Sequence, residues 1–190
     1  MNDLENWAYV VGLALGDGNL SNPTGRAVRL RISCDTKYPN LINQISSALQ
    51  RLLPQNKVGQ IKKPRNCIDV YAYSNSLENL MGWKVGQGSK YKQRVRVPKE
   101  IKQDKKLTIA CLRGLMQTDG SIYNDRGYIM VQFVTIIPTL EEDVVEMIKS
   151  LGYHPHSYKI PVSKPRKARY NIRVSKNTKK FIETIQLAKN

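Results

Sequence analysis

The chain has 190 residues, of which 41% are hydrophobic, enough for a substantial core and too many for a disordered protein. Lysine and arginine number 31 against 15 acidic residues, and this formal net charge of +16 favours a polyanionic partner, DNA or RNA. The longest strongly apolar run, residues 7–16, is too short to cross a bilayer and lacks the flanks of a secretory signal.

The three cysteines, Cys34, Cys67 and Cys111, are far apart in the sequence and odd in number. His154 and His156 have no thiol near them, so neither a disulfide framework nor a zinc site is expected. The sequence therefore predicts a protein of a reducing intracellular compartment, the cytoplasm or an organelle matrix, that is neither secreted nor attached to a membrane.

The first half predicts a helix, a strand, a helix, two strands and a short helix. These elements fall at residues 7–16, 27–33, 39–53, 58–63, 67–74 and 76–83. The segment 27–33 alternates strictly, with Val28, Leu30 and Ile32 on one face, which is typical of a half-buried strand. The faces of 67–74 stay open, because Tyr71 and Tyr73 suit either side.

The second half repeats this order after a basic connecting segment that carries Gly86 and Gly88. Its elements fall at residues 107–118, 128–135, 139–151, 156–162, 169–175 and 177–188. We therefore expect an N-terminal half at residues 1–84, a connecting segment at 85–106 and a C-terminal half at 107–190.

Direct repetition supports a duplication. Residues 7–18 (WAYVVGLALGDG) match residues 109–120 (IACLRGLMQTDG) at a shift of 102 positions, and residues 63–65 match residues 164–166, both Lys-Pro-Arg, at a shift of 101. The predicted fold is α+β, with two pseudo-symmetric αββαββα halves. Each half contributes a sheet with one apolar and one basic or polar face, which suits a nucleic-acid groove.

Both apolar helices carry small residues at every fourth position, which places these residues on one helical face. The two stripes are Ala8, Gly12 and Gly16, and Ala110, Gly114 and Thr118. Such stripes allow two helices to approach closely. Packing along them brings Asp17 and Asp119 together at the helix C-termini, where two carboxylates are costly without a cation such as Mg²⁺. For one Asp-Gly pair alone, a simple helix end followed by a turn is the better interpretation.

Residues 10–18 (VVGLALGDG) and 112–120 (LRGLMQTDG) resemble the two motifs of the LAGLIDADG homing endonucleases, of the single-chain, double-motif type. The resemblance covers nearly the whole chain. It implies a monomer whose motif helices form the interface between the halves, and whose two sheets form a saddle over the major grooves of double-stranded DNA.

The resemblance also implies a metal-dependent double-strand break across the central minor groove of a long target, leaving short 3′ overhangs. Asp17 and Asp119 would hold divalent metal with the carbonyls of Gly16 and Thr118. Mg²⁺ is the expected cofactor; Mn²⁺ is expected to substitute for it, and Ca²⁺ to bind without supporting cleavage.

Members of the family often place a basic residue near the centre, and residues 89–98 (SKYKQRVRVP) resemble the corresponding Lys-containing stretch before a proline. The spacing does not choose among Lys90, Lys92 and Arg94. Of these we take Lys92 and Arg94 as the candidates for assisting catalysis, although a loop that contacts phosphate is an equal interpretation. No counterpart is assigned in the second half.

Two groups of residues are expected to contact DNA. Outward side chains on the strands could read base edges or phosphates: Arg29, Arg31, Tyr128, Gln132, Arg169, Asn171 and Arg173. Predicted hairpin turns carry side chains suited to phosphate or flanking bases: Lys62, Lys63, Arg65, Lys164, Arg166 and Lys167.

Two other functions remain open. The same scaffold could bind intron RNA as a splicing maturase without cleavage, or it could be a DNA-binding regulator with a degenerate nuclease fold. The retention of both Asp17 and Asp119 favours cleavage, because a protein that only binds has no need of two clustered carboxylates.

Overall fold

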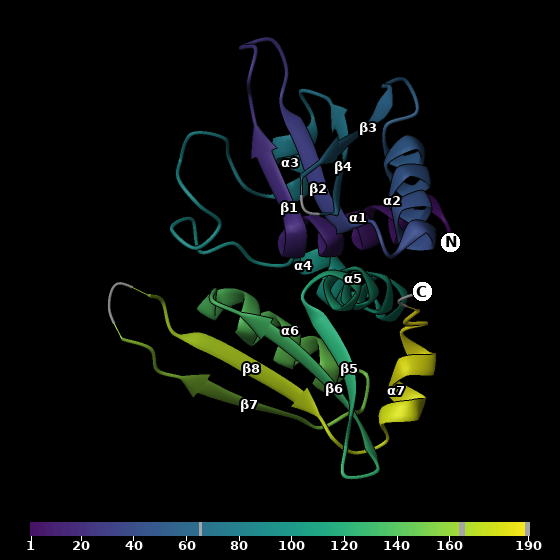
Figure 1. Ribbon diagram of the computed structural model, residues 1–190, viewed down its shortest axis with the longest axis vertical. Coiled ribbons are helices and arrows are strands. Elements are labelled where there is room, and N and C mark those ends of the chain that lie inside the picture. The colour runs from purple at the N-terminus through teal and green to yellow at the C-terminus, as the bar shows by residue number, and fades with distance from the viewer. Residues whose placement is uncertain (65, 164–165, 189–190) are drawn as a thin grey trace.

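Two halves of similar construction meet along a central pair of helices, α1 and α5 (Figure 1). The computed structural model describes residues 1–64, 66–163 and 166–188. The first half contains α1 (Asp3–Asp17), β1 (Gly18–Ser21), β2 (Arg29–Asp35), α2 (Pro39–Leu52), β3 (Val58–Lys63), β4 (Cys67–Tyr73) and α3 (Leu77–Met81). After α4 (Lys99–Gln103), the second half contains α5 (Lys105–Thr118), β5 (Gly120–Asp125), β6 (Tyr128–Thr135), α6 (Pro138–Ser150), β7 (Pro155–Ile160), β8 (Arg169–Val174) and α7 (Thr178–Thr184).

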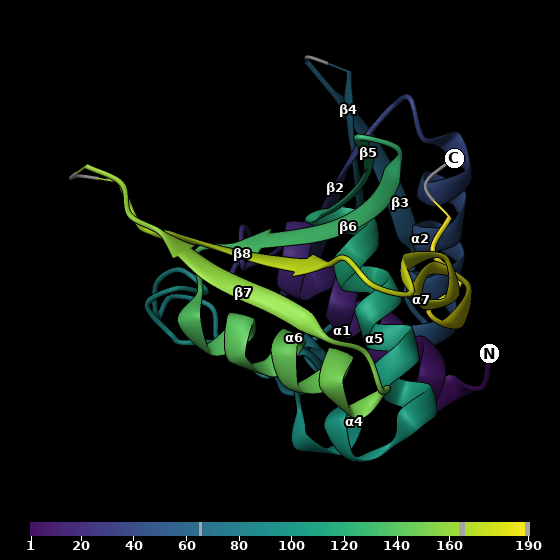
Figure 2. The same ribbon diagram turned by 90° about the horizontal axis from the view of Figure 1, so that it is seen from below.

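Each half contains one four-stranded antiparallel sheet. The strand orders are β1-β2-β4-β3 and β5-β6-β8-β7, so the two sheets have the same topology. Helices α2 and α6 lie on one side of their respective sheets, and no helix of the described residues covers the opposite sheet faces (Figure 2). The α+β class and the pseudo-symmetric halves predicted from the sequence are confirmed.

Alternation along the strands decides which face enters the core. Leu30 and Ile32 of β2 are buried beneath α1 and α2, whereas Arg29 and Arg31 lie on the opposite, partly exposed face. In the register of β2 with β4, Tyr73 lies opposite Arg29 and Tyr71 opposite Arg31. Residues that are paired across two strands share a face of the sheet, so both tyrosines point toward the uncovered face. The sequence alone did not decide this orientation.

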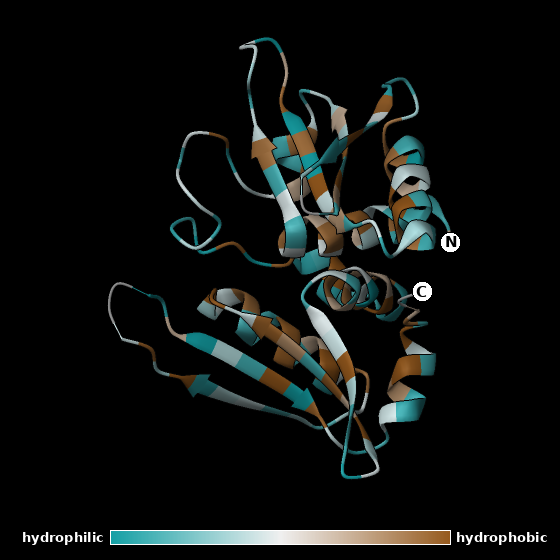
Figure 3. Cartoon of the chain, in the orientation of Figure 1, coloured by the Kyte–Doolittle hydropathy of each residue, from teal (hydrophilic) through white to brown (hydrophobic). Residues whose placement is uncertain are grey.

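The central helices pack through their small residues, in a region where hydrophobic residues concentrate (Figure 3). A Cβ added to Gly12 would overlap the backbone carbonyl of Cys111, and one added to Gly114 would overlap the carbonyl of Tyr9. The two backbones are therefore in direct contact at these glycines, as the small-residue stripes predict. Tyr9 also donates to Oε1 of Gln117 across the interface, at 2.6 Å.

The structure contains elements that the sequence analysis did not locate. Strands β1 and β5 directly follow the motif helices, and α4 lies within the expected connecting segment. Helix α1 begins four residues earlier than predicted, because Asn2 and Glu5 form a reciprocal capping box.

Helix α7 is shorter than the predicted 177–188. It ends at Thr184, and Gln186 adopts a left-handed backbone conformation with φ of 52°. The carbonyls of Ile185 and Ala188 instead accept hydrogen bonds from Arg113 and Gln117 of α5, at 2.9 and 3.0 Å. The tertiary contact thus replaces the last helical turn.

The connecting segment is fixed to the second half through Asp143 of α6, which is fully buried. This carboxylate accepts hydrogen bonds from Arg96 at 3.0 Å, from the backbone N–H of Val97 at 2.8 Å and from Lys102 at 2.9 Å. A buried carboxylate needs such compensation. Residues 96–102 therefore have a defined position against α6.

The cysteines give a test of the core. All three are free thiols; Cys34 and Cys111 are buried, and Cys67 is partly exposed. Burial, reinforced by the charge of Asp17, raises the pKa of Cys34 to about 12, and burial raises the pKa of Cys111 further. Because the thiolate is the reactive form, alkylation of the native protein should modify Cys67 alone, and denaturation should release the other two. Peptide mass spectrometry measures this; labelling of Cys111 as rapidly as Cys67 would contradict the packing.

Within the described residues, no helix is both long enough and apolar enough to cross a membrane.

Candidate metal centre and nucleic-acid interface

The two motif aspartates lie at matching ends of the central helices. Asp17 is the last residue of α1 and Asp119 directly follows α5, and both side chains are exposed. A Cβ added to Gly16 would overlap the Thr118 side chain and lie 3.4 Å from Oδ2 of Asp119. The end of α1 therefore adjoins the residues that end α5, and the predicted meeting of the two motif ends is present.

A lysine from the connecting segment binds the end of α1. Nζ of Lys90 donates to the carbonyl oxygens of Ala14, Leu15 and Gly16, at 3.0, 2.6 and 2.5 Å. The last turn of α1 has no basic residue of its own. Lys90 thus supplies the positive charge that unpaired carbonyls at a helix C-terminus favour.

The electrostatics of Lys90 also place it near both aspartates. Burial lowers the pKa of its ammonium group to about 8, while the charges of Asp119 and Asp17 oppose that change. Lys90 thus brings a positive charge close to both aspartates.

Lys92 and Arg94, taken as candidates from the sequence, do not line this centre. Both side chains are exposed; Lys92 lies over Gly88, and Arg94 occupies a turn with φ of 49°. The backbone turn that aims Lys90 inward directs its neighbours outward. The residue at the centre is Lys90, which the sequence spacing could not separate from the other two.

A cavity of about 320 Å³ opens beside the two helix ends. Its lining includes Gly16, Lys90, Tyr91, Asp119 and Lys167, so residues from both halves and the connecting segment contribute to it. Two lysines and one aspartate give the cavity a net positive lining that suits a phosphate group.

The chemistry of the two helix ends fits a divalent metal. Asp17 and Asp119 provide carboxylates, and Gly16 and Thr118 have backbone carbonyls beside them, an all-oxygen set of the kind that Mg²⁺ or Ca²⁺ prefers. Among the described residues, three or more His, Cys, Asp or Glu side chains nowhere gather closely enough to hold a metal by themselves. A metal here would therefore depend on backbone carbonyls, water or a ligand phosphate for its remaining coordination.

The uncovered face of the first sheet carries a buried carboxylate that sequence analysis missed. Asp69 of β4 is only 1% exposed. It accepts a hydrogen bond from Ser33 at 2.7 Å and forms ion pairs with Lys63 at 2.7 Å and Arg31 at 3.4 Å. Burial raises the pKa of Asp69, but the contacts with Lys63, Ser33 and Arg31 outweigh it and hold the pKa below its usual value.

The corresponding face of the second sheet has a more neutral network. Arg173 donates to the Tyr123 hydroxyl at 2.9 Å, and that hydroxyl donates to Gln132 at 3.2 Å. Asn171, which is 9% exposed, donates to Tyr158 at 3.0 Å. The two faces therefore present different sets of hydrogen-bonding groups.

Buried polar atoms without a well-aligned hydrogen bond concentrate on these two faces, although Arg31 and Asp69 are ion-paired there. Among the described residues, six buried side-chain polar atoms lack a well-aligned hydrogen bond, and five belong to Ser21, Arg29, Arg31, Asp69 and Arg173. All five residues lie on uncovered sheet faces. Buried polar groups normally have hydrogen-bond partners. Arginine N–H groups without a well-aligned acceptor are therefore suited to bind a ligand that is rich in hydrogen-bond acceptors.

The other residues that the sequence predicts to contact DNA lie at several different places in the structure. Tyr128 and Arg169 are exposed on the uncovered face of the second sheet, and Arg166 is exposed in the turn before β8. Lys62 pairs with Ile68 and so leaves β3 on the helix-covered side. Arg65 and Lys164 lie outside the described residues.

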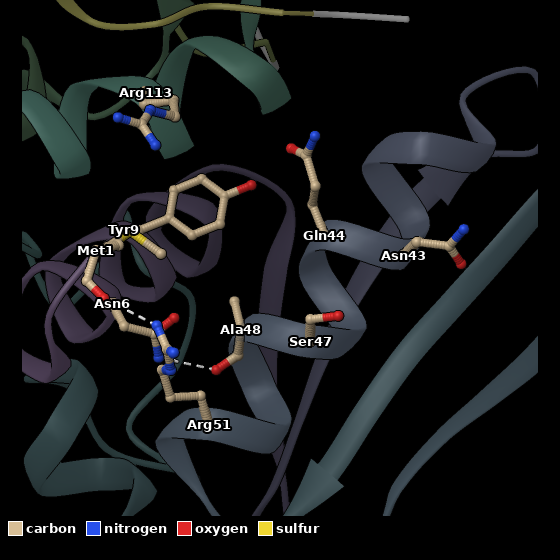
Figure 4. Close-up of a pocket in the computed structure, with 9 residues that line it drawn as sticks. All are labelled: Met1, Asn6, Tyr9, Asn43, Gln44, Ser47, Ala48, Arg51 and Arg113. Atoms are coloured by element: carbon tan, nitrogen blue, oxygen red, sulfur yellow. Dashed lines mark hydrogen bonds between the residues drawn. The ribbon is translucent and has the colours of Figure 1, made fainter.

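A separate cavity, of about 540 Å³, lies toward the N-terminal part of α1 (Figure 4). Tyr9 of α1, Gln44 of α2 and Arg113 of α5 point into this region. It shares no lining residue with the cavity at the helix ends, so it is not part of the metal centre.

Comparison with known proteins agrees with this geometry. Residues 106–186 match the family of LAGLIDADG-like domains. The structure of I-DmoI in complex with DNA and Mn has a TM-score of 0.72 and 19% identity, over 98% of this chain and 99% of that one. Mesophilic variants of the homing endonuclease I-DmoI give a TM-score of 0.70 and 21% identity, over 100% of both chains.

The N-terminal LAGLIDADG domain of DUF199/WhiA has a TM-score of 0.65 and 17% identity, over 99% of this chain and 86% of that one. No curated protein sequence matches the chain. Together these findings show that the chain has the LAGLIDADG fold, with a LAGLIDADG-like domain in its second half and a structure similar to that of I-DmoI over its whole length. The resemblance predicted from the sequence is confirmed.

Proposed function

We propose that the chain is a site-specific homing endonuclease that makes a metal-dependent double-strand break in a long DNA target and leaves 3′ overhangs. The observation that carries this proposal is the meeting of Asp17 and Asp119 at the helix ends, between two sheet faces rich in arginine. Since fold alone does not establish an activity, the charged centre is the stronger argument. The similar I-DmoI has been solved with DNA and Mn and with DNA and Ca.

In the proposed mechanism, the uncovered faces bind the major grooves of double-stranded DNA on either side of the centre. Arg29, Arg31 and Arg173 bring donors to phosphates and base edges. Asp17 and Asp119, with the carbonyls of Gly16 and Thr118, would hold the divalent metal, with Mg²⁺ the expected ion. A metal held there would supply activation of water and stabilisation of the leaving oxygen of a phosphodiester.

Lys90 is proposed as the basic residue of this centre, in place of Lys92 and Arg94. Its ammonium group lies among the carbonyls of α1 and near both aspartates. We propose the division into residues 1–84, 85–106 and 107–190 for the same reason, since the middle segment supplies this lysine to a centre built by the two flanking halves.

The test of the proposed function is selection from a randomised duplex library. One arm selects cleaved molecules in Mg²⁺, and a second selects bound molecules in Ca²⁺. We expect the two arms to converge on one long site. Duplexes bound in Ca²⁺ but never cut in Mg²⁺ or Mn²⁺ would overturn the assignment as a nuclease and make structured intron RNA the next ligand to test.

Replacing Lys90 with Met removes the charge at the centre and keeps the length of the side chain. We expect single-turnover cleavage to slow by about 100-fold, the usual effect of losing one electrostatic contact to a transition state. Lys92→Met, an exposed neighbour, should change the rate by no more than about twofold. Thermal denaturation of both variants shows whether a slower cleavage rate comes from a loss of stability or from a loss of catalysis. Equal rates for Lys90→Met and the wild type would exclude a role of Lys90 in cleavage.

A further inference from the structure

The hairpin between β7 and β8 reaches the connecting segment and contacts it. In Figure 1, the ends of β7 and β8 that lead into this hairpin lie on the same side of the molecule as the loop that joins the halves. Nζ of Lys167 lies 3.9 Å from the centre of the Tyr91 ring, the geometry of a cation–π contact. Lys167, which the sequence predicts to contact phosphate or flanking bases, thus lies beside the proposed metal centre.

The position of Tyr91 is well defined. It follows Lys90, whose ammonium group is held by α1, and its carbonyl accepts a hydrogen bond from the N–H of Arg94 at 3.2 Å. Gln93 closes the same loop by bonding to both backbone groups of Lys84, at 2.9 and 2.8 Å. A ring fixed in this way holds the ammonium group of Lys167 at one wall of the cavity.

Lys167 and Lys90 line the same cavity of about 320 Å³, together with Gly16 and Asp119. Two ammonium groups next to the proposed metal-binding carboxylate suit a phosphodiester anion. The side chain of Lys167 is exposed, so its ammonium group is accessible to such a ligand.

We propose that Lys167 contacts the scissile phosphate of one DNA strand at this cavity, so that the DNA-binding hairpin of the second half also takes part in cleavage. This inference rests on the proposed function. Asp119 lines this cavity and Asp17 does not. We therefore expect Lys167 to act on one strand and not on the other.

The test measures the cleavage of each strand separately, with a different label on each 5′ end of a duplex selected by binding in Ca²⁺. Lys167→Met keeps the length and the packing on Tyr91 but removes the charge. We expect one strand to be cut about tenfold more slowly, the usual effect of one ionised hydrogen bond, with nicked duplex accumulating. Cleavage of the other strand and the affinity in Ca²⁺ should be nearly unchanged, and Lys167→Arg should restore the rate.

Lys159→Met is the matched control. Lys159 lies in the same hairpin and also over a tyrosine, Tyr170, at 6.0 Å, but it is not part of the cavity lining. Cleavage of both strands at the wild-type rate by Lys167→Met would overturn the inference. Equal slowing of both strands with a matching loss of affinity would also overturn it, since Lys167 would then be a general phosphate anchor. If the wild type itself cuts no duplex, the proposed function fails first, and the inference fails with it.

Discussion

Replacing Asp17 with Asn, or Asp119 with Asn, should abolish double-strand cleavage and leave DNA binding in place. Each change keeps the shape of the side chain and removes the charge that the proposed metal requires. We expect the cleavage rate to fall by at least about 1,000-fold, above the effect of losing a single uncharged donor. Gel-shift titration in Ca²⁺ and single-turnover cleavage in Mg²⁺ measure the two properties on the same duplex.

The stability of the same variants separates a catalytic from a structural role. Both aspartates lie at helix C-termini, where a carboxylate is unfavourable for the helix. Their attraction to the ammonium group of Lys90 opposes this effect. Without metal, Asp17→Asn and Asp119→Asn should therefore melt near the wild-type temperature. Asp35→Asn is the control, because Asp35 is an exposed carboxylate at the end of β2 and should affect neither property. Wild-type cleavage by either motif variant would contradict the proposed centre.

Gly12→Ala and Gly114→Ala should destabilise the protein strongly. In a free helix the exchange of Gly for Ala gains about 1 kcal/mol, so a loss must come from packing. At Gly12 the added Cβ would overlap the carbonyl of Cys111, and at Gly114 the carbonyl of Tyr9. Backbone atoms cannot turn aside as a side chain can, so the helices must separate. We expect a loss of about 3 kcal/mol or more, at the upper end of the cost of overpacking.

Chemical denaturation measures this loss. Leu4→Ala serves as the control, because Leu4 is 63% exposed on the same helix and contributes little packing. Separation of the helices would also move Asp17 away from Asp119, so cleavage should fall together with stability. A Gly12→Ala protein as stable as the wild type would mean that the helices do not meet at this residue.

The fold followed from local patterns that the tertiary structure preserves. The strands β3 (Val58–Lys63) and β6 (Tyr128–Thr135) have the bounds predicted from the sequence, because alternation and flanking turns define them locally. The small residues in α1 and α5 predicted the central packing, since a stripe without side-chain bulk has few other uses. The capping signature Asn2–Glu5 was present in the sequence and could have placed the start of α1.

The details of the centre could not be predicted in the same way. Lys90, Lys92 and Arg94 are equivalent in spacing, and only the path of the connecting segment turns Lys90 inward. That path depends on Asp143, which is distant in sequence. Asp69 could have been found from the sequence, because it is a charged residue between two apolar residues of a strand. Such a position indicates the polar face of the sheet. The contact of Lys167 with Tyr91 joins two segments that no local pattern relates.

The most direct test of the central claim is to map both ends of the DNA that the wild-type protein cuts in Mg²⁺. Sequencing the two termini of a selected target shows where each strand is broken. If Asp17 and Asp119 form one centre across the minor groove, both strands are cut and the products carry short 3′ overhangs. A single nick, blunt ends or 5′ overhangs would contradict that arrangement of the two aspartates.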